Sequence, residues 1–330
     1  MIKNQWYVVL DSKEINSKPV GVTRLGVKLV FWRNSQGKVS CVHDLCPHLG
    51  AKLSQGKVNE DCLACPFHGF EFDSSGQCVY LPAVGRKGDI PKAMHTEAYP
   101  TFEAHGYIWI WWGDPNIMQS QPKWVDIDES FSYAGFSETW PVHYSRMVEN
   151  QLDVAHLPFV HYNTIGSGDK TVVEGPIVKI DADVLTLWVY NRVDDGTPPR
   201  KSEELPKPTR PPFLIFNFPN LWENRISEDV RITAAFVPID EDHSKIYIRS
   251  WQRFVRLPVA RHVVNAVTNW ASIYITHQDR RVVREQLPKK TALKKFGEKI
   301  TPADGAILAY RTHRDQLKQA TGQLEEEKIS

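Results

Sequence analysis

Two short segments of the chain each place a cysteine close to a histidine. The first segment is Cys46-Pro47-His48-Leu49-Gly50, and the second is Cys65-Pro66-Phe67-His68-Gly69. Two thiolates and two imidazoles in such a pattern are typical of a metal centre. The glycine of each segment allows a positive φ at a loop tip, and each proline stiffens its loop without offering an amide donor. The chain must therefore fold so that two separate loops meet at one centre.

The predicted centre is a [2Fe–2S] cluster in which two cysteines bind one iron and two histidines bind the other. Its four expected ligands are Cys46, His48, Cys65 and His68. Neutral imidazoles raise the reduction potential above that of an all-cysteine cluster. A structural zinc site is the alternative, because residues 41–43 form a second C-x-H and residues 62–65 form C-x-x-C. The proline and glycine beside both half-sites favour the cluster.

These residues resemble the Rieske domain of ring-hydroxylating and demethylating oxygenases. The resemblance rests on C-P-H-L-G at residues 46–50 and C-P-F-H-G-F at residues 65–70. Rieske proteins of respiratory complexes carry an additional cysteine in each loop, whereas Ala51 and Phe67 stand at those positions here. The resemblance therefore implies a cluster of low potential that a soluble electron donor reduces.

A second group of polar residues follows as Asn150-x-x-Asp153-x-x-His156-x-x-x-x-His161. On an ideal helix His161 lies about 140° around the axis from His156, so the two imidazoles cannot bind one metal without distortion. Pro158 between them is expected to supply the bend. The pattern resembles the mononuclear-iron motif of Rieske oxygenases, which implies that His156 and His161 bind Fe(II) and that Asn150 supports them. A structurally ordinary pair of histidines is the alternative.

The third iron ligand is expected on a helix near the C-terminus. Asp279 is spaced with Ile275 and Val282 as a core-facing stripe, where a carboxylate is costly unless it is paired or metal-bound. The family places its carboxylate in a Q-D-R-x-x-x-x-Q setting, which resembles residues 278–286 of this chain. Asp279 is therefore the expected ligand and Glu285 the second choice, while an ion pair with a neighbouring arginine is the structural alternative.

Asp153 receives a separate role from the same resemblance. In the family the matching aspartate joins a cluster histidine of one subunit to an iron histidine of the next. This implies that Asp153 carries electrons between subunits, from His68 of one chain to His156 of another, within a ring-shaped homotrimer. The alternative is that Asp153 only orients His156 within its own chain.

The pattern of the chain predicts two domains of an α+β protein. Residues 1–115 contain short strands broken by glycine-rich turns, which indicates an antiparallel β domain that carries the cluster. Residues 116–330 form the expected iron domain, a helix-grip fold in which a long helix lies across an antiparallel sheet. The expected helices are 138–161, 258–287 and 302–322, and the expected strands are 177–180, 184–189, 226–237 and 246–254.

Composition excludes several other classes of protein. A formal net charge of +1 over 330 residues gives no reason to expect binding to nucleic acid or to an acidic membrane. The apolar run at residues 6–10 is too short for a membrane span or a signal peptide. Five cysteines, several of them candidate ligands, fit a reducing cytoplasm.

The resemblance implies a terminal oxygenase that receives electrons from NAD(P)H through a reductase, with or without a ferredoxin. It would use Fe(II) and O₂ to hydroxylate or demethylate a small aromatic or alicyclic compound. Its pocket is expected near residues 213–216, Trp222 and the late helix, and a packed strand core is the alternative for those aromatic residues. The length resembles the compact homotrimers of the vanillate and dicamba demethylase type. Two alternatives stay open: cis-dihydroxylation of a ring, and a Rieske electron-transfer protein with a binding domain.

Overall fold

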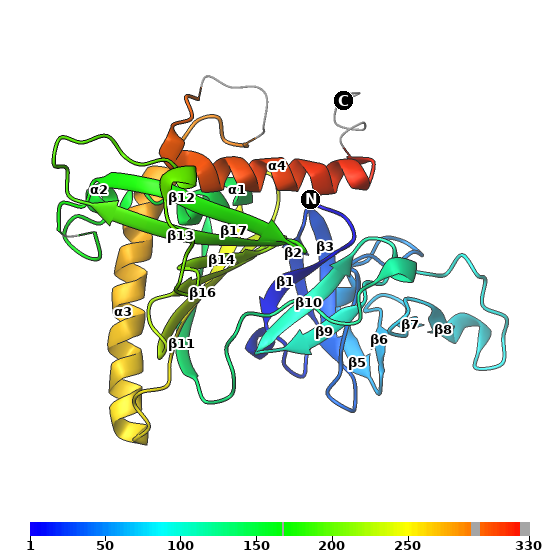
Figure 1. Ribbon diagram of the computed structural model, residues 1–330. Helices are drawn as coiled ribbons and strands as arrows, with labels where there is room; N and C mark the ends of the chain where they lie inside the picture. Colours follow the sequence, from blue (N-terminus) through cyan, green and yellow to red (C-terminus); the bar gives the residue numbers. More distant parts are fainter. Residues whose placement is uncertain (167, 292–297, 324–330) are drawn as a thin grey trace. The chain divides into compact units, whose positions relative to one another are not determined.

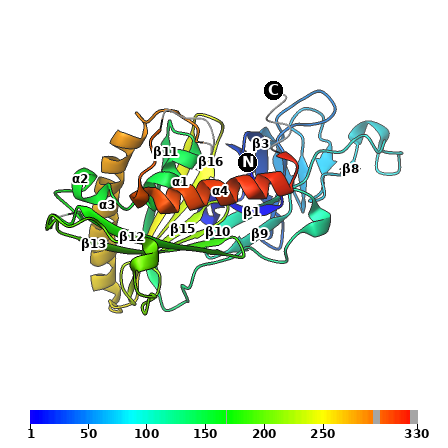
Figure 2. The same ribbon diagram turned by 45° about the horizontal axis from the view of Figure 1, so that its top comes forward.

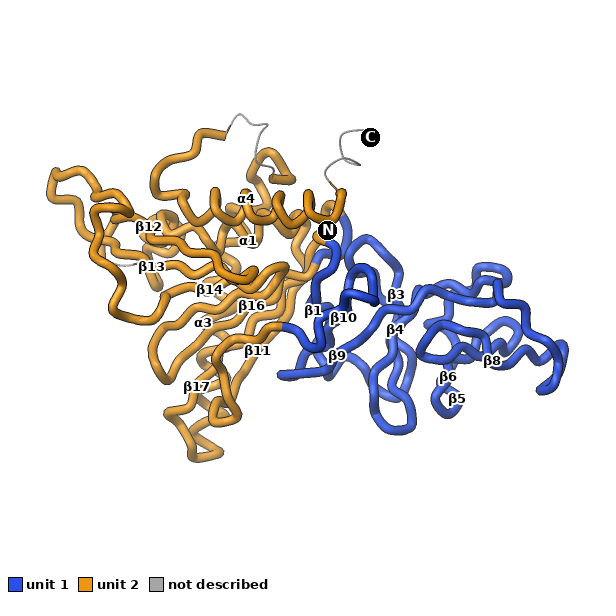
Figure 3. Tube along the Cα trace, turned by 45° about the vertical axis from the view of Figure 1, so that its right-hand side comes forward, with its two compact units in different colours: residues 1, 3–122, 238–240 blue, residues 2, 123–237, 241–330 orange. Residues whose placement is uncertain are grey.

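The chain folds into two compact units, which Figure 3 shows in separate colours. The computed structural model describes residues 1–166, 168–291 and 298–323. The first unit consists mainly of residues 3–122, with residues 238–240, and the second mainly of residues 123–237 and the chain from residue 241 onward.

The first unit contains three small antiparallel sheets, with the strand orders β1-β10-β9, β2-β3-β4 and β5-β6-β7-β8. Its strands are β1 (Gln5–Asp11), β2 (Val20–Arg24), β3 (Val27–Arg33), β4 (Val39–His43), β5 (Lys57–Asn59), β6 (Cys62–Ala64), β7 (Glu71–Phe72), β8 (Cys78–Tyr80), β9 (Thr101–Ala104) and β10 (Tyr107–Trp112).

Strand β3 divides the core of this unit into two parts. Successive side chains of a strand point to opposite faces, so Leu29 and Phe31 enter one buried cluster and Val30 and Trp32 enter the other. The second cluster also contains Cys46 and Cys65, the two candidate cysteine ligands. The loops that carry them therefore rest on a packed apolar core.

The second unit is built on one seven-stranded antiparallel sheet, in the order β11-β17-β16-β15-β14-β13-β12. Its strands are β11 (Ser132–Trp140), β12 (Val172–Asp181), β13 (Val184–Arg192), β14 (Leu214–Asn217), β15 (Leu221–Arg225), β16 (Val230–Pro238) and β17 (Ser244–Gln252). Its helices are α1 (Tyr144–Leu152), α2 (Leu157–Val160), α3 (Pro258–Val283) and α4 (Gly305–Ala320).

Two of these helices pack on the sheet. The long helix α3 lies against β11 and β17, and α4 lies against β12 and beside α1 (Figures 1 and 2). This arrangement confirms the predicted α+β class, with an antiparallel β unit followed by a helix-grip unit. The predicted helix at 138–161 is wrong at its start, because residues up to Trp140 belong to β11 and pair with β17. Among the described helices, none combines the length and the apolar character that a bilayer span requires.

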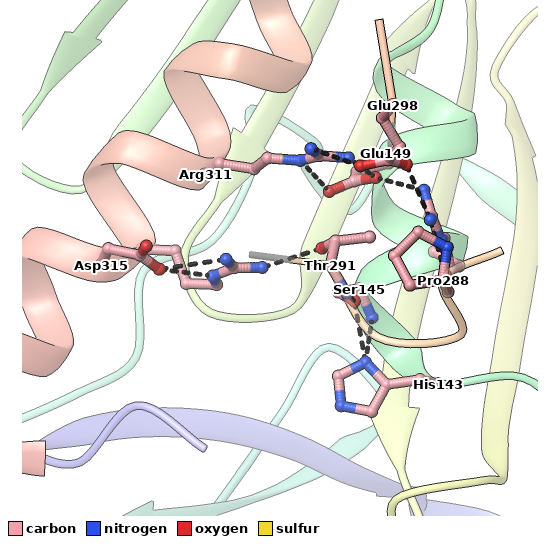
Figure 4. A network of polar contacts seen from close by, with 10 residues as sticks. His143, Ser145, Glu149, Pro288, Thr291, Glu298, Arg311 and Asp315 are labelled. Atoms are coloured by element: carbon pink, nitrogen blue, oxygen red, sulfur yellow. Dashed lines mark hydrogen bonds and ion pairs between the residues drawn. The ribbon is translucent and has the colours of Figure 1, made fainter. Parts of the chain in front are cut away.

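A buried network of ion pairs joins α1 to the C-terminal helix α4 (Figure 4). Arg311 of α4 donates from Nε and Nη2 to the two carboxylate oxygens of Glu149 on α1, at 2.7 and 2.8 Å. Glu298 accepts from Arg311 Nη1 at 2.9 Å and from Arg146 Nη2 at 2.7 Å. Charges this far from water are stable only while each retains its partner. The network therefore fixes α1, the helix that leads to the candidate iron histidines.

His143 caps the N-terminus of α1 from a buried position. Its Nδ1 accepts the backbone N–H of Ser145 at 3.3 Å and lies 2.8 Å from the Ser145 hydroxyl oxygen. Burial, with a contribution from Lys290, lowers the pKa of His143 to about 4. A protonated imidazole could not accept that N–H, and it would bring positive charge to the positive end of the helix dipole.

We expect the free energy of unfolding to decrease as the pH falls from about 6.5 to about 4. Between these pH values His143 binds a proton in the unfolded chain but not in the folded chain. This difference lowers the free energy of unfolding by on the order of 3 kcal/mol. His143→Asn keeps a capping oxygen but does not titrate, so it should flatten the slope. Thermal unfolding across this pH range measures the effect. An equal slope in the variant would assign the pH dependence to other groups.

Candidate metal centres

The two loops with the candidate cluster ligands close in the same way. In the first, the Cys46 N–H donates to Ala51 O at 2.8 Å and the Gly50 N–H donates to Cys46 O at 3.0 Å. In the second, the Cys65 N–H donates to Phe70 O at 2.8 Å and the Gly69 N–H donates to Cys65 O at 3.0 Å. Both glycines have positive φ, at 74° and 70°, as their position at the loop tips requires.

The four side chains divide into a buried pair and an exposed pair. Cys46 and Cys65 are buried, whereas the imidazoles of His48 and His68 are exposed and bring their Nδ1 atoms to 3.3 Å from each other. The ring of Phe70 stacks on His48 with centroids 5.0 Å apart. The structure thus brings together all four predicted ligands, with the cysteines toward the core and the histidines toward the surface.

The cysteine environment fits a metal cluster. Burial raises the pKa of Cys46 to about 11, although the backbone N–H groups of His48 and Leu49 partly offset it. A buried thiol of this kind ionises when a metal takes the place of its proton. A third segment, Pro82–Val84, lies close by, because a Cβ on Gly69 would stand 3.5 Å from Pro82 Cγ. The set suits the [2Fe–2S] cluster that its mixed donors predict.

The candidate iron histidines lie at the two ends of a one-turn helix. Helix α1 ends at Leu152 with Asp153 as its C-cap, and α2 begins after His156 and ends before His161. The predicted bend at Pro158 is wrong in position, since this proline lies in the first turn of α2, where a missing N–H costs nothing. The chain turns at residues 153–156 instead, and the short helix then separates the two histidines.

The structure places Asp279 beside both histidines. Its Oδ1 lies 3.5 Å from His156 Nε2 and 3.1 Å from His161 Nε2, and the three ligand atoms lie within 4.8 Å of one another. Two donor atoms that each lie about 2.1 Å from one ion, with a donor–metal–donor angle of about 90°, are about 3 Å apart. Oδ1 is buried and has no hydrogen-bond partner among the described residues. Two imidazoles and one carboxylate therefore fit one metal ion and leave coordination positions open.

The face of α3 that carries Asp279 differs from the predicted stripe. Thr276, Asp279 and Val283 are the buried positions of α3, whereas Val282 is 37% exposed. Glu285, the second choice of ligand, lies beyond the helix with an exposed side chain and pairs with Arg284 at 3.0 Å. Of the two carboxylates considered, Asp279 alone contacts the histidines.

Two glutamines that are not among the predicted site residues hold the candidate ligands in place. His161 Nδ1 donates to Gln278 Oε1 at 2.9 Å, which leaves its Nε2 lone pair directed at Asp279 and the metal position. Gln151 Nε2 donates to Asp279 Oδ2 at 3.2 Å, so the second carboxylate oxygen is also held. Gln278 precedes Asp279 in the quoted motif, which is the signal that could have identified it. Gln151 had no comparable signal.

The environment of the histidines favours positive charge. Burial opposes charge on His161, but the Asp279 carboxylate and Gln278 more than offset it, so the pKa of His161 is raised. Burial likewise opposes charge on Asp153, and the contacts with His156 and the Ala155 N–H outweigh it, so the pKa of Asp153 is lowered. Asp153 stays ionised at neutral pH as a result.

The remaining predicted residues lie near these ligands. Asp153 Oδ2 is 3.7 Å from His156 Nδ1, and its Oδ1 accepts the Ala155 N–H at 2.7 Å. The Asn150 side-chain nitrogen is buried without a hydrogen-bond partner among the described residues, which include both histidines. The supporting role expected of Asn150 therefore stays a prediction.

A cavity of about 800 Å³ opens beside the three ligands, between the sheet, α2 and α3. Phe213, Leu214 and Trp222 line it as expected, whereas Phe216 packs against Tyr310 instead. Much of the remaining wall is aliphatic, including Ile232, Ile248 and Ile275. An apolar cavity that ends at a metal position suits a small organic molecule.

Comparison with known proteins agrees with this geometry. Residues 5–101 match the family model of the Rieske [2Fe-2S] domain, and residues 140–320 match that of the vanillate O-demethylase oxygenase C-terminal domain. The chain belongs to the Rieske oxygenase family. Its cofactors are a Rieske [2Fe–2S] cluster and a mononuclear non-heme iron.

Named Rieske oxygenases resemble parts of the chain. Aminopyrrolnitrin oxygenase from Pseudomonas fluorescens is 34% identical over 47% of this chain and 45% of its own length. The oxygenase component of dicamba O-demethylase from Stenotrophomonas maltophilia is 31% identical over 60% of this chain and 58% of its own length. The chain thus spans about half the length of the curated relatives it matches. The crystal structure of dicamba monooxygenase bound to dicamba has the same fold, with a TM-score of 0.74, 21% identity and coverage of 98% of this chain and 99% of that one.

In this Rieske oxygenase we expect Gln278→Leu to weaken Fe(II) binding about 10- to 100-fold. The leucine removes the acceptor for His161 Nδ1, so the ring is free to turn and to change tautomer. Competition with a chromophoric chelator measures the affinity. Gln278→Glu keeps an acceptor oxygen and should retain most of it. Equal loss in both variants would mean that Gln278 acts through packing.

Proposed function

We propose that the chain is the oxygenase component of a Rieske system and that it hydroxylates, or O- or N-demethylates, a small aromatic or alicyclic compound. Electrons would come from NAD(P)H through a reductase, with or without a ferredoxin. The observation that carries the proposal is the convergence of His156, His161 and Asp279 at the end of an apolar cavity. The match to the vanillate O-demethylase oxygenase C-terminal domain supports monooxygenation over ring dihydroxylation.

Each predicted ligand keeps its role in this proposal. Cys46, His48, Cys65 and His68 hold the cluster within residues 1–115, and His156, His161 and Asp279 hold Fe(II) within residues 116–330. When bound, the cluster supplies single electrons and the iron supplies dioxygen activation. Gln278 accepts the proton on Nδ1 of His161, so that the unprotonated Nε2 faces the metal position. Gln151 donates to Oδ2 of Asp279, so that Oδ1 faces the same position. The apolar wall holds the substrate and excludes bulk water.

The protein is proposed to act as a homotrimer in which Asp153 passes electrons from His68 of one subunit to His156 of the next. Exposed apolar side chains lie on or next to the segments that carry the candidate ligands of both centres, which is typical of surfaces that another protein covers. Leu45, Leu49 and Phe67 belong to the cluster segments, and Phe159, Tyr162 and Ile165 belong to α2 and the turn after it. A head-to-tail contact between these surfaces gives a ring where the rotation between neighbouring subunits closes, as the proposed homotrimer requires. The five free cysteines suit a reducing cytoplasm.

The rival from another class is a Rieske electron-transfer protein with an appended binding domain. Such a carrier needs neither the buried Asp279 nor the two imidazoles beside its Oδ1, whereas a mononuclear iron site needs all three. Iron content separates the two: about three irons per chain for the oxygenase and about two for the carrier.

Product analysis with ¹⁸O₂ tests the proposal. The purified chain, a surrogate reductase and NADH would be incubated with a panel of methoxy, N-methyl and unsubstituted aromatic compounds. We expect either one labelled oxygen atom in a hydroxylated product, or a demethylated product together with an aldehyde, whose own oxygen exchanges with water through its hydrate. Cluster reduction that yields neither a labelled nor a demethylated product would contradict the oxygenase assignment, and two labelled atoms on adjacent ring carbons would indicate dihydroxylation.

A further inference from the structure

Two side chains of the sheet hold the end of helix α1 and the turn after it. The indole of Trp222, on β15, donates from Nε1 to Gln151 O at 3.2 Å. The carboxamide of Asn191, on β13, donates from Nδ2 to Val154 O at 3.3 Å. A carbonyl oxygen only accepts hydrogen bonds, so the nitrogen of the carboxamide must face it. The two anchored carbonyls therefore lie on either side of Asp153 in the chain.

The contact from Trp222 replaces a hydrogen bond that α1 lacks at its C-terminal end. In a continuous α-helix, Gln151 O would accept the N–H group of Ala155, four residues further on. Here the Ala155 N–H donates to Asp153 Oδ1 at 2.7 Å instead. The last carbonyls of a helix need partners from outside it, and the indole supplies one. Water does not readily replace this donor, because Trp222 is only 5% exposed.

The anchored segment contacts two of the three candidate iron ligands, Asp279 and His156. Gln151, whose carbonyl the indole holds, donates from its side chain to Asp279 Oδ2 at 3.2 Å. Asp153 lies two residues further on, and its Oδ2 is 3.7 Å from Nδ1 of His156. A shift of this segment would therefore disturb the support of both ligands at once.

We propose that Trp222 and Asn191 are positioning residues of the mononuclear iron site. Neither binds the metal, and each fixes the backbone from which residues 151 and 153 reach the candidate ligands. The inference rests on the proposed function in one respect, that Asp279 binds iron. Both side chains also line the cavity, so the wall that encloses the cavity supports the metal site as well.

Metal binding to the purified chain tests this proposal without any turnover. Trp222→Phe keeps an aromatic ring in the cavity wall but removes the N–H donor, and Asn191→Leu removes the other donor at a similar side-chain size. We expect each variant to bind Fe(II) about 3- to 10-fold more weakly in competition with a chromophoric chelator. Co(II) is the spectroscopic probe, because its visible absorption bands depend on the arrangement of its ligands. Both variants should shift those bands.

Trp188→Phe is the matched control. It removes the same kind of hydrogen bond, since the Trp188 indole donates to Arg210 O at 2.9 Å, but that bond holds a segment without any candidate metal ligand. We expect it to lower the melting temperature as Trp222→Phe does, yet to leave the Fe(II) affinity and the Co(II) bands unchanged.

Two results would overturn the proposal. One is wild-type affinity and wild-type bands in both Trp222→Phe and Asn191→Leu, and the other is an equal change in Trp222→Phe and Trp188→Phe. The test is independent of the oxygenase assignment. A chain with the expected metal binding that forms neither a labelled nor a demethylated product would lose the proposed function and keep these positioning residues.

Discussion

Asp153→Ala should keep both metal centres and lose about 100-fold in turnover. The carboxylate is ionised, and its Oδ2 lies 3.7 Å from the Nδ1 atom of His156, on the side of the ring opposite the metal. Alanine removes this contact but none of the seven predicted ligands. Iron and sulfide analysis should therefore be unchanged, while the reduced cluster should be oxidised far more slowly in a single turnover. Full activity in the variant would refute a role for Asp153 in electron transfer.

Subunit mixing decides whether the electrons cross between chains. His68→Ala should lack a functional cluster, and Asp279→Ala should lack the iron, so each variant alone is inactive. If electrons cross from one subunit to the next, co-expression should restore part of the activity. If Asp153 acts only within its own chain, every subunit of the mixture is missing one centre and activity stays at background. Asp153→Asn adds a test of charge, since it keeps the shape of the side chain.

Arg311→Met should lower the free energy of unfolding by about 3 kcal/mol or more. The substitution removes both hydrogen bonds to Glu149 and the contact with Glu298, all of them shielded from water. The carboxylates of Glu149 and Glu298 are then left with one cation between them, the largely buried guanidinium of Arg146. A loss of this size lowers the melting temperature of a unit of this length by roughly 10 °C. Calorimetry would detect it.

Arg253→Met is the control for this prediction. Arg253 forms a comparable ion pair with Asp229 at 2.8 Å, but both side chains are substantially exposed. Solvent screens such a pair, so its removal should cost less than about 1 kcal/mol. Similar losses in the two variants would show that burial of the α1–α4 network does not set its strength.

Local spacing explains which features could be predicted from the sequence. The predicted cluster ligands lie within two loops of a few residues, so their types, with the adjacent proline and glycine, mark them as candidates without knowledge of the fold. The same short spacing marks His156 and His161 as candidate iron ligands. The fold class followed from the order of short strands, helix, strands and long helix, and dicamba monooxygenase shares it.

Contacts between distant segments explain what could not be predicted. Gln151 and Asp279 come from different helices, and their hydrogen bond exists only after α1 packs beside α3. The turn at residues 153–156 was misplaced because proline disfavours the interior of a helix but is well tolerated in its first turn, and sequence alone does not say where a helix begins. The prediction that Val282 faces the core is wrong, because a regular helical period does not show which neighbouring stripe faces the sheet.

The side chains proposed to bind iron and some of those that line the cavity belong to different kinds of backbone. The histidines and Asp279 come from helix ends and from a long helix, whereas Lys170 and Arg210 lie on connecting segments before β12 and β14. Connecting segments accept replacement and changes of length far more readily than packed helices do. Laboratory evolution for a new compound could therefore randomise these segments without changing the candidate metal ligands. In the same way, related chains could come to accept different substrates while they keep those ligands.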